Sequence, residues 1–162
     1  MSKAFDASSM IYAWDNYPPA NFPPLWRWME CQIQSETFVM PSIAFDELKT
    51  RAPDCHAWLR EKQLARISVT NAILEEAVRI KALLGIEGER YHPKGVGEND
   101  ILIVATAAVE CLELISNEGR QHILPKDRAK MKIPAVCELE AVNVPCMDFV
   151  TLIRQSDEVF GD

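Results

Sequence analysis

The stretch AFDASSMIYAW, residues 4–14, joins the end of a strand to the start of a helix. Lys3–Phe5 is a short apolar strand candidate, and it ends at the carboxylate of Asp6. A helix follows within a residue or two, where Ser8 or Ser9 can cap its first turn. Because an unpaired carboxylate beside a core strand loses its hydration, its position needs a compensating partner. The stretch predicts a strand-to-helix unit with a functional acid at the junction.

The rest of the chain repeats this alternation of short apolar strands and helices. We expect further strands at residues 37–40, 67–69, 114–115, 133–137 and 141–144. We expect helices from Pro23, from Ser42, over 71–84, from Glu98 or Asn99, and over 146–155. Strands that alternate with helices predict an α/β domain with a mainly parallel sheet, in which ligands bind beyond the carboxyl ends of the strands.

Composition and charge limit the class of protein. The 162 residues, 48% of them hydrophobic and 25% charged, predict one globular domain over residues 1–162. A charged residue, Asp6, falls where a secretory signal would be apolar. The longest apolar run, 101–109, is too short to cross a bilayer. We therefore expect a cytoplasmic protein without a membrane span. The net charge of -7 argues against a protein that coats nucleic acid, but it suits an acidic site that holds cations.

The five cysteines do not form a Cys-x-x-Cys pair, and their number is odd. This spacing indicates reduced, mostly buried thiols, and it favours neither a disulfide framework nor a zinc site.

Four acids stand at strand ends or near helix starts within apolar sequence: Asp6, Glu47, Asp100 and Glu118. Burial of several carboxylates together is unfavourable unless a cation neutralises them, and oxygen ligands suit Mg²⁺ or Mn²⁺. Each acid also has a structural explanation: Asp6 can cap a helix, Glu47 can be a solvated helix residue, Asp100 can be an acid in the first turn that the helix dipole favours, and Glu118 can begin a turn. Taken together, the four are more informative than any one of them.

These segments resemble the PIN (PilT N-terminal) domain family, which includes the VapC-type toxin nucleases. The resemblance extends from about Lys3 to Val144, and the C-terminal region resembles a bacterial PIN-like branch distinct from the well-studied toxins. The motifs occur in the family order: FDASSMIYA with Asp6 and Ser8, VMPSIAFDEL with Glu47, NDILIVATAA with Asp100, and SNE with Ser116 and Glu118.

The resemblance implies a three-layer α/β/α sandwich of about five strands. It also implies that the four acids are catalytic and hold one or two Mg²⁺ or Mn²⁺ ions, and that metal-activated water hydrolyses RNA to 5'-phosphate and 3'-hydroxyl products. One departure is that Glu118 replaces the usual Asp, so that Asn117 is a candidate to contribute in its place. Ser8, Ser116 and Asn117 are expected as supporting residues. Implied partners are RNA, the antitoxin of a type II toxin–antitoxin pair and a second copy in a homodimer.

RNA contact requires positive charge in a protein that is acidic as a whole. The candidates are Arg90 and Lys94 in a glycine-rich loop, and Lys126 and Arg128 in the stretch KDRAKMK. A solvated surface loop is the alternative explanation of that stretch.

Aromatic residues give a second group of candidate contacts. Tyr12, Trp14 and Tyr17 either stack on unpaired bases or pack internally. The segment LWRWM resembles the helical clip that binds antitoxin and a second toxin copy in relatives, with Trp26 and Trp28 on different faces of the helix.

Two other functions fit parts of the sequence. A PIN-like module with a weakened site would serve only in protein interaction. A metal-dependent phosphatase or nucleotide hydrolase often carries Asp-x-Asp at the first strand end, and here Asp6 is followed by Ala7 and Ser8, which counts against that class.

Overall fold

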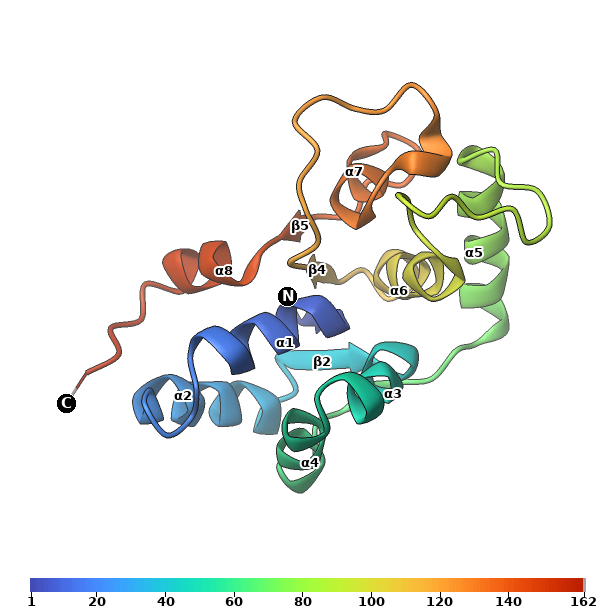
Figure 1. The fold of residues 1–162 in the computed structure, drawn as a ribbon. Helices are drawn as coiled ribbons and strands as arrows, with labels where there is room; N and C mark the ends of the chain where they lie inside the picture. Colours follow the sequence, from blue (N-terminus) through green and yellow to red (C-terminus); the bar gives the residue numbers. More distant parts are fainter. Residues whose placement is uncertain (162) are drawn as a thin grey trace.

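Five short parallel strands form the centre of the protein in a computed structural model that describes residues 1–161 (Figure 1). Their order is β3-β2-β1-β4-β5, and each neighbouring pair is parallel. The predicted α/β fold with a parallel sheet is therefore confirmed. The strands are β1 Lys3–Phe5, β2 Phe38–Pro41, β3 Arg66–Ile67, β4 Glu113–Ile115 and β5 Cys146–Met147.

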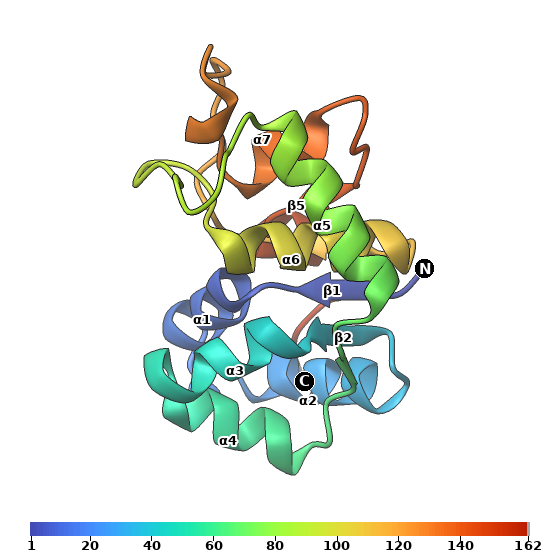
Figure 2. The same cartoon turned by 90° about the vertical axis from the view of Figure 1, so that its right-hand side faces the viewer.

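Helices cover both faces of this sheet. Figure 2 shows α5, α6 and α7 on one side of β1 and β2, with α2, α3 and α4 on the other. This arrangement is the expected three-layer sandwich. The helices are α1 Ala7–Asn16, α2 Pro23–Gln34, α3 Ser42–Arg51, α4 Pro53–Glu61, α5 Asn71–Leu83, α6 Glu98–Val109, α7 Ile133–Glu138 and α8 Phe149–Ser156, with the 3-10 turn η1 at Arg128–Lys130.

Buried aromatic rings join the sheet to the helices. Phe5 of β1 lies 4.9 Å from Phe38 of β2 and 6.4 Å from Phe149 of α8, measured between ring centroids. The predicted apolar stripe of α2 is also inside the core, where Trp26 is 4% exposed and Met29 is fully buried. These contacts fix the first strand, and with it the position of Asp6.

The region after residue 130 differs from the sequence prediction. Residues 133–137, predicted as a strand, form the helix α7, since Pro134 suits the first turn of a helix. Residues 141–144 do not form the predicted strand, because Asn143 has a left-handed backbone (φ 51°) that breaks an extended segment. The fifth strand is β5 instead, and the last helix begins at Phe149 rather than Cys146, with the Asp148 carboxylate accepting a bond from Thr151 N at 2.8 Å.

Two smaller differences concern the segment between β2 and α5. The third strand is Arg66–Ile67, which shares only Ile67 with the predicted 67–69. The helix α4 was not predicted, although Pro53 in its first turn and the buried pair Cys55 and Leu59, four residues apart, are helix signals.

The topology brings the ends of β1 and β4 to one edge of the sheet. Phe5 pairs with Ile115, so that Asp6 and Ser116 follow the two strands at the same level. Within residues 1–161, the helices are too short or too polar to span a membrane.

Candidate active site

Asp6 is a buried carboxylate surrounded by hydrogen-bond donors. Its side chain accepts bonds from Ser9 N and Ser8 Oγ at 2.8 Å and from Ser116 Oγ at 2.5 Å. Asp6 is thus the N-cap of α1, which was one of the explanations that the sequence left open for it, and neither Ser8 nor Ser9 takes that position. Burial raises the pKa of Asp6, and the bonds from Ser116, Ser9 and Ser8 act in the opposite direction.

A second set of hydrogen bonds joins the start of α1 to the end of β4. Asp6 N donates to the carbonyl of Ile115 at 3.0 Å, and Ser9 Oγ donates to the same carbonyl at 2.8 Å. Ser8 Oγ accepts a bond from Asn117 N at 3.0 Å, but the Asn117 side chain turns away and accepts from the Phe149 backbone. Ser8 and Ser116, predicted as supporting residues, therefore contact the Asp6 carboxylate, and the Asn117 side chain does not.

Glu47 and Asp100 come from helices on opposite sides of the sheet. Glu47 lies in α3, half-buried, 3.6 Å from the guanidinium of Arg51. Its pKa is raised by burial and then by the negative charges of Asp100 and Asp6, while Arg51 and a bond from Asn99 lower it. Because the charges of Asp100 and Asp6 act on Glu47, the three carboxylates share one electrostatic environment.

Asp100 stands in the first turn of α6, as the sequence predicts. Its Oδ2 accepts a bond from Gly97 N at 3.0 Å, which closes the first turn of the helix. Burial raises the pKa of Asp100, while the bond from Gly97 and the charge of Arg51 lower it.

Glu118 lies in the loop after β4. Its Oε2 accepts a bond from Ile133 N at 3.2 Å. Burial, followed by the negative charge of Asp100, raises the pKa of Glu118 to about 7, and Asp6 adds to the effect. We call Asp6, Glu47, Asp100 and Glu118 the acidic cluster.

The donor atoms of the acidic cluster suit Mg²⁺ or Mn²⁺, but its side chains as they stand do not surround a common point. The cluster offers only carboxylate oxygens, the donors that these ions prefer. Burial and then negative neighbours raise the pKa of Glu47 and Glu118, and a cation would favour the charged form of both carboxylates. However, among residues 1–161 no three His, Cys, Asp or Glu side chains stand close enough to hold a metal ion as they are. Asp6, Asp100 and Glu118 each accept hydrogen bonds from donors of their own, so Glu47, Asp100 and Glu118 would have to turn toward Asp6 to share an ion with it.

Two hollows border the acidic cluster. One, of about 300 Å³, is lined by Ile43, Asp46, Glu47 and Asn99. The other, of about 560 Å³, is lined by residues 116–120 together with α7 and residues 145–148 and reaches Thr151 and Gln155 of α8. We call this second hollow the β4–β5 pocket. It gives solvent and ligands access to Glu118.

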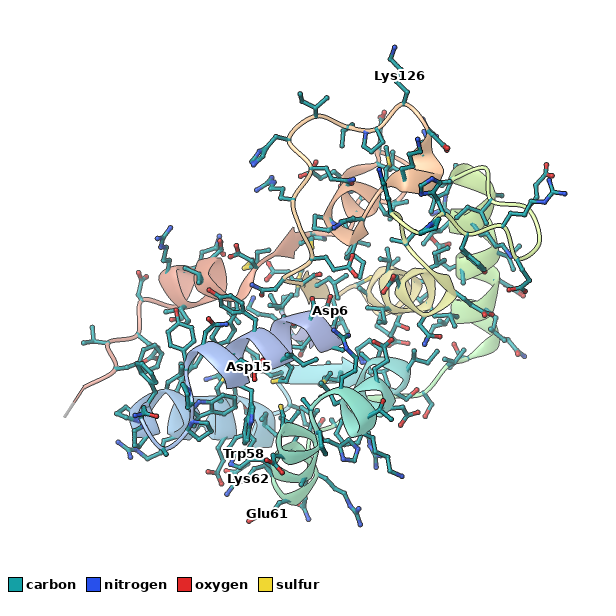
Figure 3. All side chains as sticks on the ribbon, in the orientation of Figure 1. Asp6, Asp15, Trp58, Glu61, Lys62 and Lys126 are labelled. Atoms are coloured by element: carbon teal, nitrogen blue, oxygen red, sulfur yellow. The ribbon has the colours of Figure 1, made fainter. Side chains whose placement is uncertain are left out.

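The predicted RNA-binding side chains lie in exposed loops and at the start of η1. Arg90, Lys94, Lys126 and Arg128 are exposed, and Arg128 donates to the carbonyl of Leu83 at 3.3 Å. Figure 3 shows Lys126 at the outer tip of the loop between β4 and α7, directed away from Asp6.

Two other cations are electrostatically coupled to the acidic cluster. Arg51 lowers the pKa of Glu47 and Asp100, and Lys132 lowers that of Glu118. Sequence reasoning missed Arg51, although its position four residues after Glu47 on a helix was a usable signal.

The aromatic candidates pack internally. Trp14 lies 5.2 Å from Trp26, and Tyr12 lies 6.5 Å from Phe149, measured between ring centroids. Tyr17 lies 5.8 Å from Phe149. In the α2 segment Trp26 is buried, and the half-buried Trp28 packs on Phe38 and Phe160 of its own chain, at 5.2 and 5.4 Å.

Known structures share the fold. VapBC2 from Rickettsia felis bound to a DNA fragment from their promoter superposes with a TM-score of 0.56 at 16% identity, covering 92% of this chain and 99% of that one. PAE2754 from Pyrobaculum aerophilum gives a TM-score of 0.54 at 13% identity, covering 98% of this chain and 91% of that one. At these identities the likeness is one of fold.

Sequence comparison gives the family directly. No protein of curated function matches the sequence. A family model described as "Domain of unknown function (DUF4411)" matches residues 4–160, almost the whole chain, and this protein therefore belongs to the DUF4411 family.

Proposed function

We propose that this protein is a PIN-type ribonuclease that requires Mg²⁺ or Mn²⁺ and acts as the toxin of a toxin–antitoxin pair. The observation that supports it is the acidic cluster: carboxylates from the end of β1, from α3, from α6 and from the loop after β4 act on one another at one edge of a parallel sheet. The fold shared with VapBC2 of Rickettsia felis makes a nuclease toxin the function to test first.

In this proposal Asp6, Glu47 and Asp100 hold the ion, with Glu118 as an outer ligand. When bound, the ion supplies an activated water and stabilises charge on the phosphodiester. Ser116 and Ser8 orient the Asp6 carboxylate through their hydrogen bonds, so that it need not be reordered when the ion arrives. The raised pKa of Glu118 makes it a candidate acid for the leaving oxygen near neutral pH.

The same proposal extends to partners and location. The Rickettsia felis structure is a VapBC complex with promoter DNA, so an antitoxin that binds DNA is the partner to seek next to this gene. RNA is the proposed substrate, the cytoplasm the proposed location, and a homodimer the proposed oligomer. Exposed Arg90, Lys94, Lys126 and Arg128 are proposed to attract the RNA backbone over longer distances.

The test is RNA cleavage with Mn²⁺ by the protein and by two charge-removing variants. We expect Asp6→Asn and Asp100→Asn to lose cleavage by about 100-fold or more, because each removes a metal ligand. The matched control is Asp15→Asn, which makes the same change at an exposed position of α1, away from Asp6 in Figure 3. Cleavage that survives in both site variants would defeat the proposal.

One observation favours the second candidate, an interaction module without catalysis. As the side chains stand within residues 1–161, no three potential ligands surround one point. Calorimetric titration with Mn²⁺ separates the two functions. Binding that is lost in Asp6→Asn but kept in Asp15→Asn supports the nuclease, and no binding at millimolar Mn²⁺ supports the interaction module.

A further inference from the structure

The β4–β5 pocket has the size and the position of a binding site for part of a substrate. Its volume of about 560 Å³ falls within the roughly 300–1,000 Å³ of pockets that take small ligands. Glu118 lines it, so the pocket borders the acidic cluster. Pro134, Pro145 and Met147 supply apolar surface, against which a flat ring can lie. The pocket therefore suits a planar group of the molecule on which the acidic cluster acts.

The charges around the pocket argue against a phosphate group inside it. Among the described residues that line it, three carry carboxylates, Glu118, Glu138 and Asp148, and one carries a guanidinium, Arg120. Arg120 is bonded to Glu138 at 3.0 Å, so this cation is already paired. The two remaining carboxylates repel an anion and accept hydrogen bonds from N–H groups. A neutral ligand that presents N–H donors fits this lining.

A hydrogen-bond donor and an acceptor line the pocket where α8 begins. Asn117 Oδ1 accepts a bond from Phe149 N at 3.0 Å, and this bond fixes which end of the Asn117 amide faces α8. Within residues 1–161 no buried side-chain polar atom lacks a partner, so the Asn117 NH₂ group, which has none there, is accessible to a ligand. Asp148 directly precedes Phe149, and its Oδ1 accepts from Thr151 N at 2.8 Å. Its Oδ2 accepts no bond from the described residues and is also available.

This arrangement matches the base-pairing edge of one nucleobase. Guanine presents the acceptor O6 beside the donors N1–H and N2–H, so the Asn117 amide can donate to O6 while the Asp148 carboxylate accepts from both donors. Adenine, cytosine and uracil do not present an acceptor beside two donors on this edge. Because the same edge forms base pairs in a duplex, a guanine bound in this way has to be unpaired.

We propose that the β4–β5 pocket binds an unpaired guanine of the RNA, next to the phosphodiester that the acidic cluster would cleave. The inference rests on the proposed nuclease function, and it gives the substrate class as RNA with a guanosine outside a duplex at the cleavage site. Asn117 and Asp148 determine the base specificity, while Glu118 lies between the bound base and the rest of the acidic cluster.

The experiment measures RNA binding without cleavage, by fluorescence anisotropy in EDTA at low salt. The probes are labelled single-stranded pentanucleotides with the sequences UUGUU, UUAUU, UUCUU and UUUUU. We expect UUGUU to bind about five- to tenfold more tightly than the other three, as a carboxylate that accepts two hydrogen bonds from a base supplies. Asp148→Asn should reduce this preference to less than about twofold and leave the binding of UUUUU unchanged, because the amide offers a single acceptor oxygen.

The variant keeps the start of α8, since asparagine caps a helix as well as aspartate does. The matched control is Asp157→Asn, the same change at an exposed residue at the other end of α8, outside the pocket lining. Asparagine also tolerates the left-handed backbone of residue 157 (φ 56°). Where Asp148→Asn is unstable, amide NMR spectra of the wild type test the same contact, and the side-chain amide of Asn117 should shift with guanosine but not with uridine.

Three results would overturn the inference alone: equal binding of the four RNAs, a preference for another base, or a guanine preference that persists in Asp148→Asn. A guanine preference without Mn²⁺-dependent cleavage by the wild type would overturn the nuclease proposal and leave the pocket as a binding site. Failure of every RNA to bind, with no shift of Asn117 by guanosine, would overturn both the guanine site and RNA as the substrate.

Discussion

Glu118→Gln tests whether the negative charge of Glu118 destabilises the folded protein. The substitution removes one negative charge and keeps the shape of the side chain, and the Gln carbonyl oxygen can still accept the bond that Glu118 Oε2 takes from Ile133 N at 3.2 Å. The main change is therefore electrostatic. We expect the variant to be more stable than the wild type at alkaline pH.

The size of the effect follows from the pKa of Glu118, which burial and then the charges of Asp100 and Asp6 raise from 4.5 to about 7. A raised pKa means that the folded state binds the proton more tightly than the unfolded state. The stability that the protonated form of Glu118 contributes is fully present below pH 4.5 and is lost as the pH rises through about 7. By linkage, the charged Glu118 costs about 3 kcal/mol at pH 8 and about 1 kcal/mol at pH 5, and glutamine avoids both costs.

Urea unfolding followed by tryptophan fluorescence measures this difference, because Trp14 and Trp26 pack against one another in the folded state. The gain of Glu118→Gln over the wild type should be clearly larger at pH 8 than at pH 5. Adding Mn²⁺ at pH 8 should reduce the difference in unfolding free energy between Glu118→Gln and the wild type, since a bound ion would neutralise the negative charge of Glu118 in the wild type. Equal gains at the two pH values, or no gain at pH 8, would refute the reasoning.

Two further predictions concern the surroundings of the acidic cluster. Arg51→Ala should strengthen Mn²⁺ binding about two- to fivefold in calorimetry at low salt, because the Arg51 guanidinium competes with the ion for the Glu47 carboxylate. The control is Arg60→Ala, and weaker Mn²⁺ binding by Arg51→Ala than by this control would contradict the prediction. Gly95→Ala should cost about 2 kcal/mol in urea unfolding, because its Cβ would lie 1.8 Å from the Ala129 carbonyl oxygen. The control Gly119→Ala meets only Lys132 at an ordinary 3.7 Å, so equal stability of the two variants would count against the prediction.

Most of the N-terminal half of the fold, with the exception of α4, was predictable because its strands and helices carry strong local signals. β1 is followed at once by a capped helix, and α2 shows a clear apolar stripe that the structure buries. The C-terminal half was less predictable because its elements are short. In α7, six residues leave too little sequence for a helical period to be distinguished from a strand, and β5 has only two residues.

The acids of the candidate site were identifiable because each interrupts apolar sequence, but their hydrogen-bond partners were not. The bond between Ser116 and Asp6 joins residues 110 apart, and the bond from Phe149 N to the Asn117 side chain joins residues 32 apart. The spacing of residues along the sequence does not indicate such long-range contacts. Arg51 is the exception, since its spacing from Glu47 was visible in the sequence.

The donors around Asp6 offset part of the cost of burying a carboxyl group at the end of a core strand. Two serine hydroxyls and one backbone N–H supply directed bonds that lower its pKa, in opposition to burial. Glu118 has a single backbone donor, and burial followed by the charge of Asp100 raises its pKa to about 7. Fewer bonds therefore hold the Glu118 carboxylate than the Asp6 carboxylate, so Glu118 is the side chain that turns more freely when it takes up a proton or a cation. The acidic cluster thus pairs a restrained carboxylate at the end of β1 with a less restrained one on the loop after β4.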